Sequence, residues 1–215
     1  MKKETQKFIV LGMLFIFPIV IYLFFASGIN NFAKLPVLTD EVYDISKISN
    51  TTFDNKITIL GFFGNNVKDK HGDALNLNQK IYKRFYKFKD FQFVMIQPVG
   101  TEILTETLKN ELRAGTNTDL VNWNFIFATE SDLLKVYQSL QTDFNLDSNL
   151  GTPFVFIIDR NGNLRGRDDK DGTKFGYDSR SVADINNNML DDVKVILAEY
   201  RMALKKNNIY KDQLK

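Results

Sequence analysis

Gly151-Thr152-Pro153-Phe154-Val155-Phe156-Ile157-Ile158-Asp159-Arg160-Asn161-Gly162 is the stretch that decides the fold. Its five consecutive apolar residues, 154–158, are β-branched or aromatic, follow a proline and end at an aspartate. Such a run is typical of a strand that is buried on both faces. The Asn161-Gly162 pair tolerates positive φ angles, so we expect a tight turn there and a hairpin into residues 164–167.

The composition is that of a globular protein and excludes several kinds of chemistry. Hydrophobic residues make up 44% of the 215-residue chain and charged residues 25%, which suits one domain with a proper core. The net charge of +2 predicts no nucleic-acid partner. There is no cysteine, which excludes disulfides, thiolate nucleophiles and dithiol redox chemistry. A catalytic triad or a histidine metal site would have to rest on the single histidine, His71.

The N-terminal segment predicts a membrane anchor. Residues 1–7 carry three lysines, and residues 8–26 then run without a charge, which is about the length that crosses a bilayer. The lysines favour a cytoplasmic N-terminus, so we expect the domain behind the helix to lie in the periplasm or outside the cell. The alternative is a signal peptide cleaved after residues 26–28, although its apolar core would be longer than usual.

The remainder predicts a linker at 27–52, one domain at 53–206 and a flexible tail at 207–215. Apolar runs and helical stripes predict strands at 56–63, 91–97 and 123–128, and helices at 75–88, 103–112, 132–144 and from about 179 to 204. The polar, glycine-rich residues 166–177 read as a surface loop. Strands that alternate with helices favour an α/β fold with a largely parallel sheet.

From residue 56 to residue 200 the chain resembles the SCO/SenC family, the thioredoxin-fold copper chaperones of cytochrome oxidase assembly. The matching blocks stand in the family's order: Ile59-Leu60-Gly61-Phe62-Phe63, 93–98, Trp123-Asn124-Phe125-Ile126-Phe127-Ala128-Thr129-Glu130, 155–162 with Leu164-Arg165-Gly166, and a final helix around 190–197. The spacing from Pro153 to Asp159 resembles membrane-anchored thiol-disulfide proteins equally well. The resemblance implies an α/β, thioredoxin-like three-layer sandwich, here with an N-terminal transmembrane helix.

The resemblance also gives a role to Thr152-Pro153. In thioredoxin-like proteins a cis-proline stands beside the active site, at an edge that takes extended polypeptide. We therefore expect a cis-proline edge at Thr152 and Pro153. The dipeptide alone also fits an ordinary trans proline that opens a strand.

The positions of the family's copper ligands are changed in this chain. The family uses two cysteines in a C-x-x-x-C loop after the first strand and a histidine before a later strand. The resemblance places these ligands at Asn66, Lys70 and Gly151. An amide, an ammonium group and a glycine do not ligate soft Cu(I), so neither copper transfer nor disulfide reduction carries over.

The sequence therefore predicts a binding or assembly module without redox activity, for an envelope or respiratory-complex protein. Its docking face would be residues 64–73 and 151–153. We expect no cofactor and no enzymatic activity, because no nucleophile stands beside a base. The alternative is a metal-handling protein with a relocated site at His71, which has Asp69 and Asp73 nearby. A solvated histidine in a polar loop explains His71 better than a metal site does.

Overall fold

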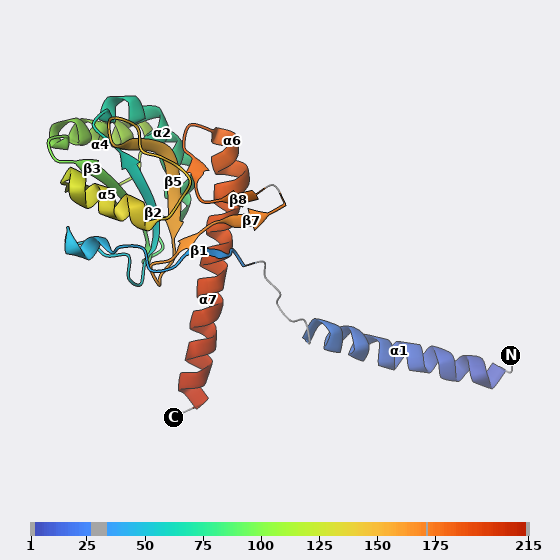
Figure 1. The fold of residues 1–215 in the computed structure, drawn as a ribbon. Helices are drawn as coiled ribbons and strands as arrows, with labels where there is room; N and C mark the ends of the chain where they lie inside the picture. Colours follow the sequence, from blue (N-terminus) through green and yellow to red (C-terminus); the bar gives the residue numbers. More distant parts are fainter. Residues whose placement is uncertain (1–2, 27–33, 171, 214–215) are drawn as a thin grey trace. The chain divides into compact units, whose positions relative to one another are not determined.

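The computed structural model of the chain describes residues 3–26, 34–170 and 172–213 (Figure 1). The chain divides into two compact units, one within residues 1–33 and one from Lys34 onward. The first unit holds the helix α1 (Lys3–Ala26). Within the described ranges, no helix combines the length and the apolar character that a membrane crossing requires. The transmembrane helix predicted for residues 8–26 is therefore not confirmed.

The second unit is an α/β domain in which helices η1 and η2 are 3-10 turns and η3 and η4 are single π-helical turns. Its elements follow in the order β1 (Val37–Thr39), η1 (Ile45–Lys47), β2 (Ile57–Phe63), η2 (Val67–Lys70), α2 (His71–Leu77), η3 (Asn78–Tyr82), α3 (Lys83–Phe85), β3 (Phe91–Pro98), α4 (Glu102–Thr116), β4 (Trp123–Ala128), α5 (Glu130–Ser139), β5 (Gly151–Ile158), β6 (Leu164–Arg165), β7 (Arg167–Asp169), β8 (Gly172–Lys174), β9 (Tyr177–Asp178), α6 (Val182–Asp184), η4 (Ile185–Met189) and α7 (Leu190–Gln213).

The main sheet has the strand order β1-β6-β5-β2-β3-β4, and β9 also pairs with β5. Strands β2, β3 and β4 are parallel, whereas β5 is antiparallel to β2, β6 and β9. The sheet is therefore mixed, and the expectation of a largely parallel sheet is wrong for its β5 half. The tight turn after Ile158, where Gly162 has a φ of 79°, reverses the chain into β6 and makes β6 antiparallel to β5, as its sequence predicts.

The central strands are buried on both faces because their side chains alternate between two cores. On one face Phe93 and Met95 pack with residues of α2, α4 and α7. On the other face Val94 and Ile96 pack with η1 and α5. The domain thus has a sheet between two helical layers (Figure 1).

The strand order confirms the thioredoxin-like fold. In the core β3-β2-β5-β6, strand β2 is the first along the chain and lies in the middle. Strand β3 is parallel to β2 on one side, and β5 of the β5–β6 hairpin is antiparallel to β2 on the other. Helix α2 connects β2 to β3, and the chain ends in the long helix α7. Strand β4 is added at the edge beyond β3.

The domain begins near residue 34 rather than at residue 53, so the predicted linker is too long. Strand β1 pairs with β6, and Ile45 is fully buried. The guanidinium of Arg165 donates from Nε to the Leu35 carbonyl at 3.0 Å. The partners of this segment come from distant parts of the chain, which local patterns do not reveal. At the other end α7 continues to Gln213, beyond the predicted domain end at 206.

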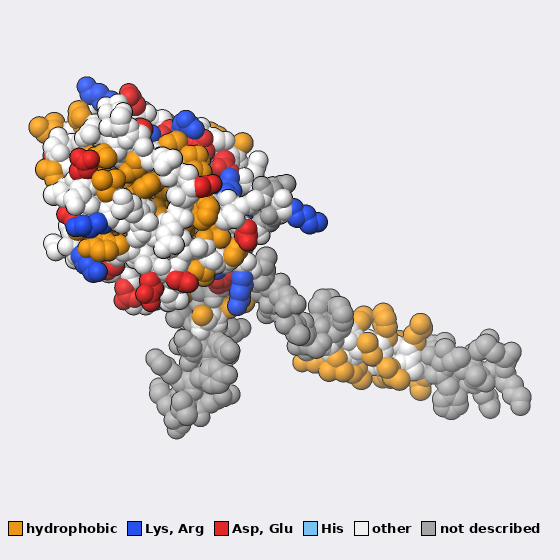
Figure 2. Space-filling model, in the orientation of Figure 1, with side chains coloured by type: hydrophobic (Ala, Val, Ile, Leu, Met, Phe, Trp, Pro, Cys, Tyr) orange, Lys and Arg blue, Asp and Glu red, His pale blue; other side chains and the backbone are white. Residues whose placement is uncertain are grey.

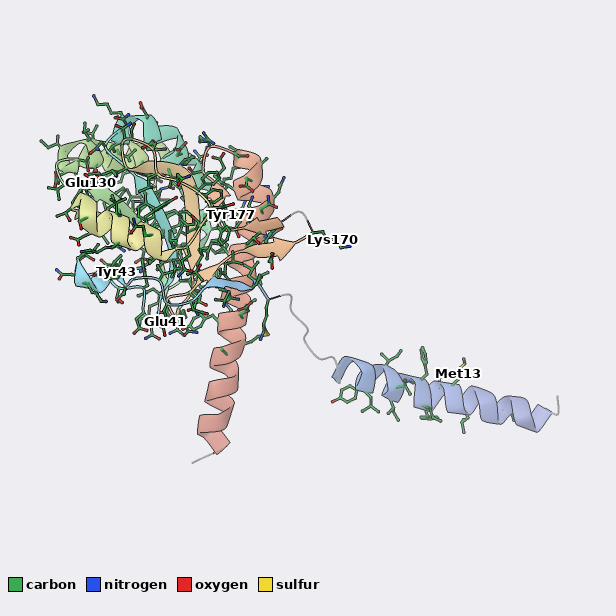
Figure 3. The ribbon with its side chains drawn as sticks, viewed as in Figure 1. Met13, Glu41, Tyr43, Glu130, Lys170 and Tyr177 are labelled. Carbon is green, nitrogen blue, oxygen red and sulfur yellow. The ribbon has the colours of Figure 1, made fainter. Side chains whose placement is uncertain are left out.

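The predicted surface loop at 166–177 contains three short strands. Lys170 lies on the β7–β8 hairpin and projects from the domain, whereas Tyr177 lies inside it (Figure 3). The Tyr177 hydroxyl donates to Asp192 Oδ2 at 2.6 Å, and Arg167 Nε donates to the same oxygen at 2.7 Å. Burial, with the Asp192 carboxylate beside it, raises the pKa of Tyr177 above its ordinary range. Arg167 and Tyr177 of this segment are thus tied to α7 through Asp192, whereas Asp168, Lys170 and Thr173 are exposed.

Candidate functional site

We define the loop end as residues 64–71, which follow β2, together with residues 149–151, which lead into β5. The two segments touch through their main chains. Asn65 N donates to the Asn149 carbonyl at 2.8 Å, and Phe63 pairs with Gly151. Gly64 has a φ of 68°, and a Cβ on it would lie 2.7 Å from Gly151 N. Only glycine fits this contact, which holds the loop after β2 against the start of β5.

The three positions to which the resemblance assigns the family's copper ligands all lie at the loop end. Asn66 is exposed, and its carbonyl accepts a hydrogen bond from Asp69 N at 3.1 Å. Lys70 Nζ lies 3.5 Å from Asp73 Oδ2. Gly151 is buried, and a Cβ there would lie 3.0 Å from the Phe63 carbonyl oxygen. An exposed amide, a paired ammonium group and a close-packed glycine do not fit soft Cu(I).

Asp73 is a buried carboxylate of α2 that contacts Lys70 at the loop end. Burial raises its pKa above the ordinary value, and the Lys70 charge opposes this shift. It also interacts with Ser179, whose carbonyl accepts from Asn76 Nδ2 at 3.2 Å. Asp73 therefore helps to join α2 to the segment that follows β9.

Pro153 is not a cis-proline and does not lie at an open edge. Among the residues that the structure describes, no peptide bond is cis. Ser179 covers the edge of β5 at this point: its N and Oγ donate to the Pro153 carbonyl at 2.9 and 2.6 Å. Strand β9 pairs with the next residues, Phe154 and Val155. The expectation of a cis-proline edge at Thr152 and Pro153 that takes extended polypeptide is therefore wrong, because the chain supplies that strand itself.

His71 does not assemble a metal site with its neighbours. Its Nε2 lies 3.5 Å from Glu111 Oε2, and both side chains are about half exposed. Asp73 is engaged with Lys70, and Asp69 is exposed. In the described part of the chain, no three His, Asp or Glu side chains are grouped so that they could hold a metal ion. The geometry gives the relocated site no support.

A groove of about 380 Å³ opens beside the loop end, between α4 and the start of α2. Val67, Leu104 and Leu108 give it an apolar floor, and Val67 and Leu108 are buried. Lys68, His71, Thr107 and Glu111 stand at its sides. We call it the loop-end groove. It can take one apolar side chain of a partner, with polar groups of both signs around it.

Two features of this region were missed by reasoning from sequence. Ser179 lies 26 residues from Pro153, and no local pattern links the two. The contribution of α4 to the loop-end groove follows from packing of that helix against α2. An amphipathic helix was expected at 103–112, but the pattern of its apolar residues does not show which other helix it packs against.

The comparisons with known proteins give a likeness of fold. The chain is similar to a SCO1/SenC family lipoprotein from Bacillus anthracis, with 18% identity and a TM-score of 0.47 over 78% of this chain and 96% of that one. It is similar to apo Sco1 from Thermus thermophilus, with 11% identity and a TM-score of 0.44 over 77% and 99% of the two chains. It is also similar to a thiol:disulfide interchange protein from Chlorobium tepidum, with 18% identity and a TM-score of 0.43 over 77% and 96%.

No family model and no curated protein matches the chain. The structural neighbours thus include both SCO1/SenC proteins and thioredoxin-family thiol-disulfide proteins, as the sequence blocks predict. The thioredoxin-like fold itself rests on the strand order described above. At these identities and TM-scores the neighbours say nothing about the activity of this chain.

Proposed function

We propose that the chain is a binding or assembly module without redox activity, attached to the cytoplasmic membrane and serving an envelope or respiratory-complex protein. One observation carries the proposal: Asn66, Lys70 and Gly151 stand at the loop end, on a thioredoxin-like scaffold that is otherwise complete. Without a thiol or a soft ligand, this end of the sheet retains shape and charge but no thiol chemistry.

The loop-end groove is the docking surface in this proposal. Its apolar floor suits a partner's apolar side chain, and its mixed charges from Lys68 and Glu111 suit a polar rim. The Pro153 edge plays no part, because Ser179 and β9 already occupy it. The partner therefore binds as a surface loop and not as an added strand at β5.

Membrane attachment rests on the N-terminal residues. Residues 8–26 carry no charge, and the described apolar side chains of α1, from Leu11 to Leu23, are exposed (Figure 2). Exposed apolar surface of this extent favours insertion into lipid over contact with water. The lysines before it favour a cytoplasmic N-terminus, and the proposal accordingly has the domain on the outer side.

Site-specific photocrosslinking tests this function. A benzophenone amino acid at Asn66, which is exposed at the loop end, is expected to crosslink the full chain to a distinct partner in intact cells. The matched control places the same group at Asn186, which is exposed on η4. The crosslinked product and the chain are expected in the membrane fraction. Equal crosslinking at both positions would contradict docking at the loop end, and recovery of the chain in the soluble fraction would contradict attachment.

A further inference from the structure

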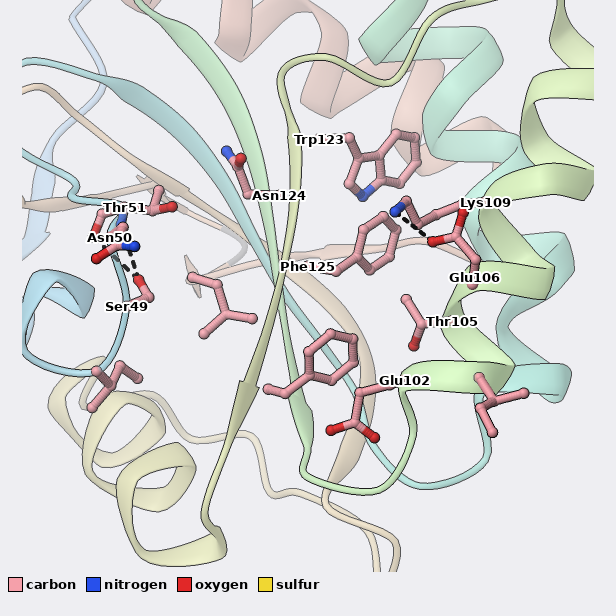
Figure 4. Close-up of a pocket in the computed structure, with 14 residues that line it drawn as sticks. Ser49, Asn50, Thr51, Glu102, Thr105, Glu106, Lys109, Trp123, Asn124 and Phe125 are labelled. Carbon is pink, nitrogen blue, oxygen red and sulfur yellow. Dashed lines mark hydrogen bonds and ion pairs between the residues drawn. The ribbon is translucent and has the colours of Figure 1, made fainter.

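A groove of about 710 Å³ lies along the outer edge of β4 (Figure 4). One wall is the segment Ser49–Thr51, and the other is the first half of α4, with Glu102, Glu106 and Lys109. Its floor is the edge of β4 itself, residues 123–127. The groove shares no residue with the loop-end groove.

The outer edge of β4 presents main-chain groups that no other strand in the described part of the chain uses. Phe93 N donates to the Asn122 carbonyl at 2.7 Å, and Val99 N donates to the Ala128 carbonyl at 3.0 Å. Because main-chain groups alternate along a strand, residues 122, 124, 126 and 128 face β3. Residues 123, 125 and 127 point their N–H and C=O groups outward. Among the described residues β3 is the one strand that pairs with β4.

The N–H groups of Phe125 and Phe127 are therefore available for a further strand. The N–H of Trp123 is not, because it donates to the Leu120 carbonyl at 3.0 Å. An edge with free donors and acceptors in this alternation is a template for another extended segment. On the α4 side, the rings of Trp123 and Phe125 stack with centroids 6.0 Å apart and planes 2° from parallel. Trp123 is only 3% exposed, so Phe125 provides most of the apolar ring surface below the edge.

The shape of the groove favours binding of a single extended segment over pairing with the edge strand of a second folded copy of this chain. Residues 49–51 and α4 rise on the two sides of the edge (Figure 4). A lone extended polypeptide needs room only for its own side chains. The edge strand of another domain would bring its own flanking helix and loop, which would meet these walls.

The charges of the groove indicate which side chains a bound segment would carry. The first turn of α4 lies at the end of the sheet where the carboxyl end of β4 lies. Glu102 is therefore near the carboxyl end of β4, and Lys109 is near Trp123 (Figure 4). Lys109 is paired with Glu106 at 2.7 Å, whereas within the described ranges Glu102 has no ion pair. Ile103, beside Glu102, is 84% exposed. This end of the groove is complementary to a basic side chain next to apolar ones.

We propose that the free edge of β4 binds an extended polypeptide segment of a partner protein. The segment adds as a strand through the main-chain groups of Phe125 and Phe127. It carries a basic residue opposite Glu102 and apolar residues against Phe125 and Ile103. This surface goes beyond the function proposed above and does not depend on docking at the loop end.

Amide hydrogen exchange on the full chain tests the inference. The probes are two nine-residue peptides of alternating threonine and valine with one arginine, at the second or the eighth position, so that both strand directions are covered. Both have counterparts with glutamate in place of arginine. An arginine peptide is expected to slow exchange at Phe125 and Phe127, with little change at Asn124 and Ile126, which already face β3. No slowing at millimolar peptide would overturn the proposal.

Two variants isolate the main-chain and charge contributions. Phe127→Pro removes an outward N–H, which an edge strand tolerates, and is compared with Phe127→Ala, which keeps it. Loss of one hydrogen bond predicts affinity about tenfold lower for the proline variant. Glu102→Gln is expected to abolish the preference for arginine over glutamate peptides, and an unchanged preference would contradict the charge argument.

The same measurement distinguishes a second copy from a partner segment. Protection of Phe125 and Phe127 that grows with protein concentration in the absence of peptide would overturn the proposal in favour of self-association. If Phe127→Pro does not fold, the wild-type exchange data and Glu102→Gln still decide the outcome. Crosslinking at Asn66 is read separately, so failure of the loop-end docking leaves this test intact.

Discussion

Replacing Gly64 with alanine is expected to lower the free energy of unfolding by about 2–5 kcal/mol. The residue has a φ of 68°, which costs an L-residue energy, and the added Cβ would lie 2.7 Å from Gly151 N and 2.9 Å from Gly151 Cα. Neither atom can move without shifting β5, because Gly151 pairs with Phe63. Urea unfolding of the full chain, followed by the fluorescence of its single tryptophan, measures the loss.

Gly162→Ala is the matched control. Gly162 has a similar φ of 79°, but a Cβ there would meet no atom within 4 Å. Only the backbone cost applies, about 1–2 kcal/mol. If the two variants lost equal stability, the close approach of the loop after β2 to the start of β5 would not be a real constraint, and the description of the loop end would be wrong.

Replacing Arg165 with leucine is expected to cost about 3–5 kcal/mol of unfolding free energy. Arg165 is 8% exposed and donates to Asp159 Oδ2 at 3.1 Å, to Glu199 Oε2 at 2.9 Å and to the Leu35 carbonyl. Leucine would leave two largely buried carboxylates without their cation. The same substitution should release the segment from residue 34 onward, which limited proteolysis detects.

The control for this variant is Arg180→Leu. Arg180 also pairs with an aspartate, at 2.8 Å, but its side chain is 62% exposed. An exposed pair contributes at most about 1 kcal/mol, so little loss is expected. A comparable loss in the two variants, or unchanged proteolysis near residue 34 in Arg165→Leu, would mean that the N-terminal segment does not depend on this cluster.

The core strands could be predicted from the sequence because their signal is local. Runs such as 57–63, 91–98 and 154–158 are mostly apolar on both faces, and the structure places them in the centre of the sheet with nearly all of their side chains buried. The hairpin after Asp159 was predicted equally well, because Asn161-Gly162 specifies its own turn. These elements, with the strand order that they allow, are enough to define a thioredoxin-like fold.

What the sequence could not provide are contacts between distant segments. Residues 34–52 read as part of a linker, since their partners Arg165 and Leu140 lie 130 and 101 residues away along the chain. The Pro153 edge seemed open because Ser179 is not adjacent in sequence. The alternation Trp123-x-Phe125-x-Phe127 marks a strand, but its unpaired edge appears only when the strand order is known.

At the loop end the chemistry could be read from the sequence, whereas its geometry could not. The absence of cysteine and the residues Asn66, Lys70 and Gly151 already exclude the family's ligand set. The structure adds that Lys70 is engaged with Asp73 and that Gly151 is in close contact with Phe63. A histidine placed at 151 would therefore disturb the backbone there, because its Cβ would lie 3.0 Å from the Phe63 carbonyl oxygen.

The central claim is that this thioredoxin-like domain retains the scaffold but not the copper chemistry that its resemblance implies. Titration of the full chain with Cu(I) against a colorimetric chelator tests it most directly. We predict that the metal stays with the chelator at all protein concentrations, because the loop end offers no soft ligand. Transfer of one equivalent of Cu(I) to the protein would contradict the account, and loss of that binding in His71→Ala would identify the ligand responsible.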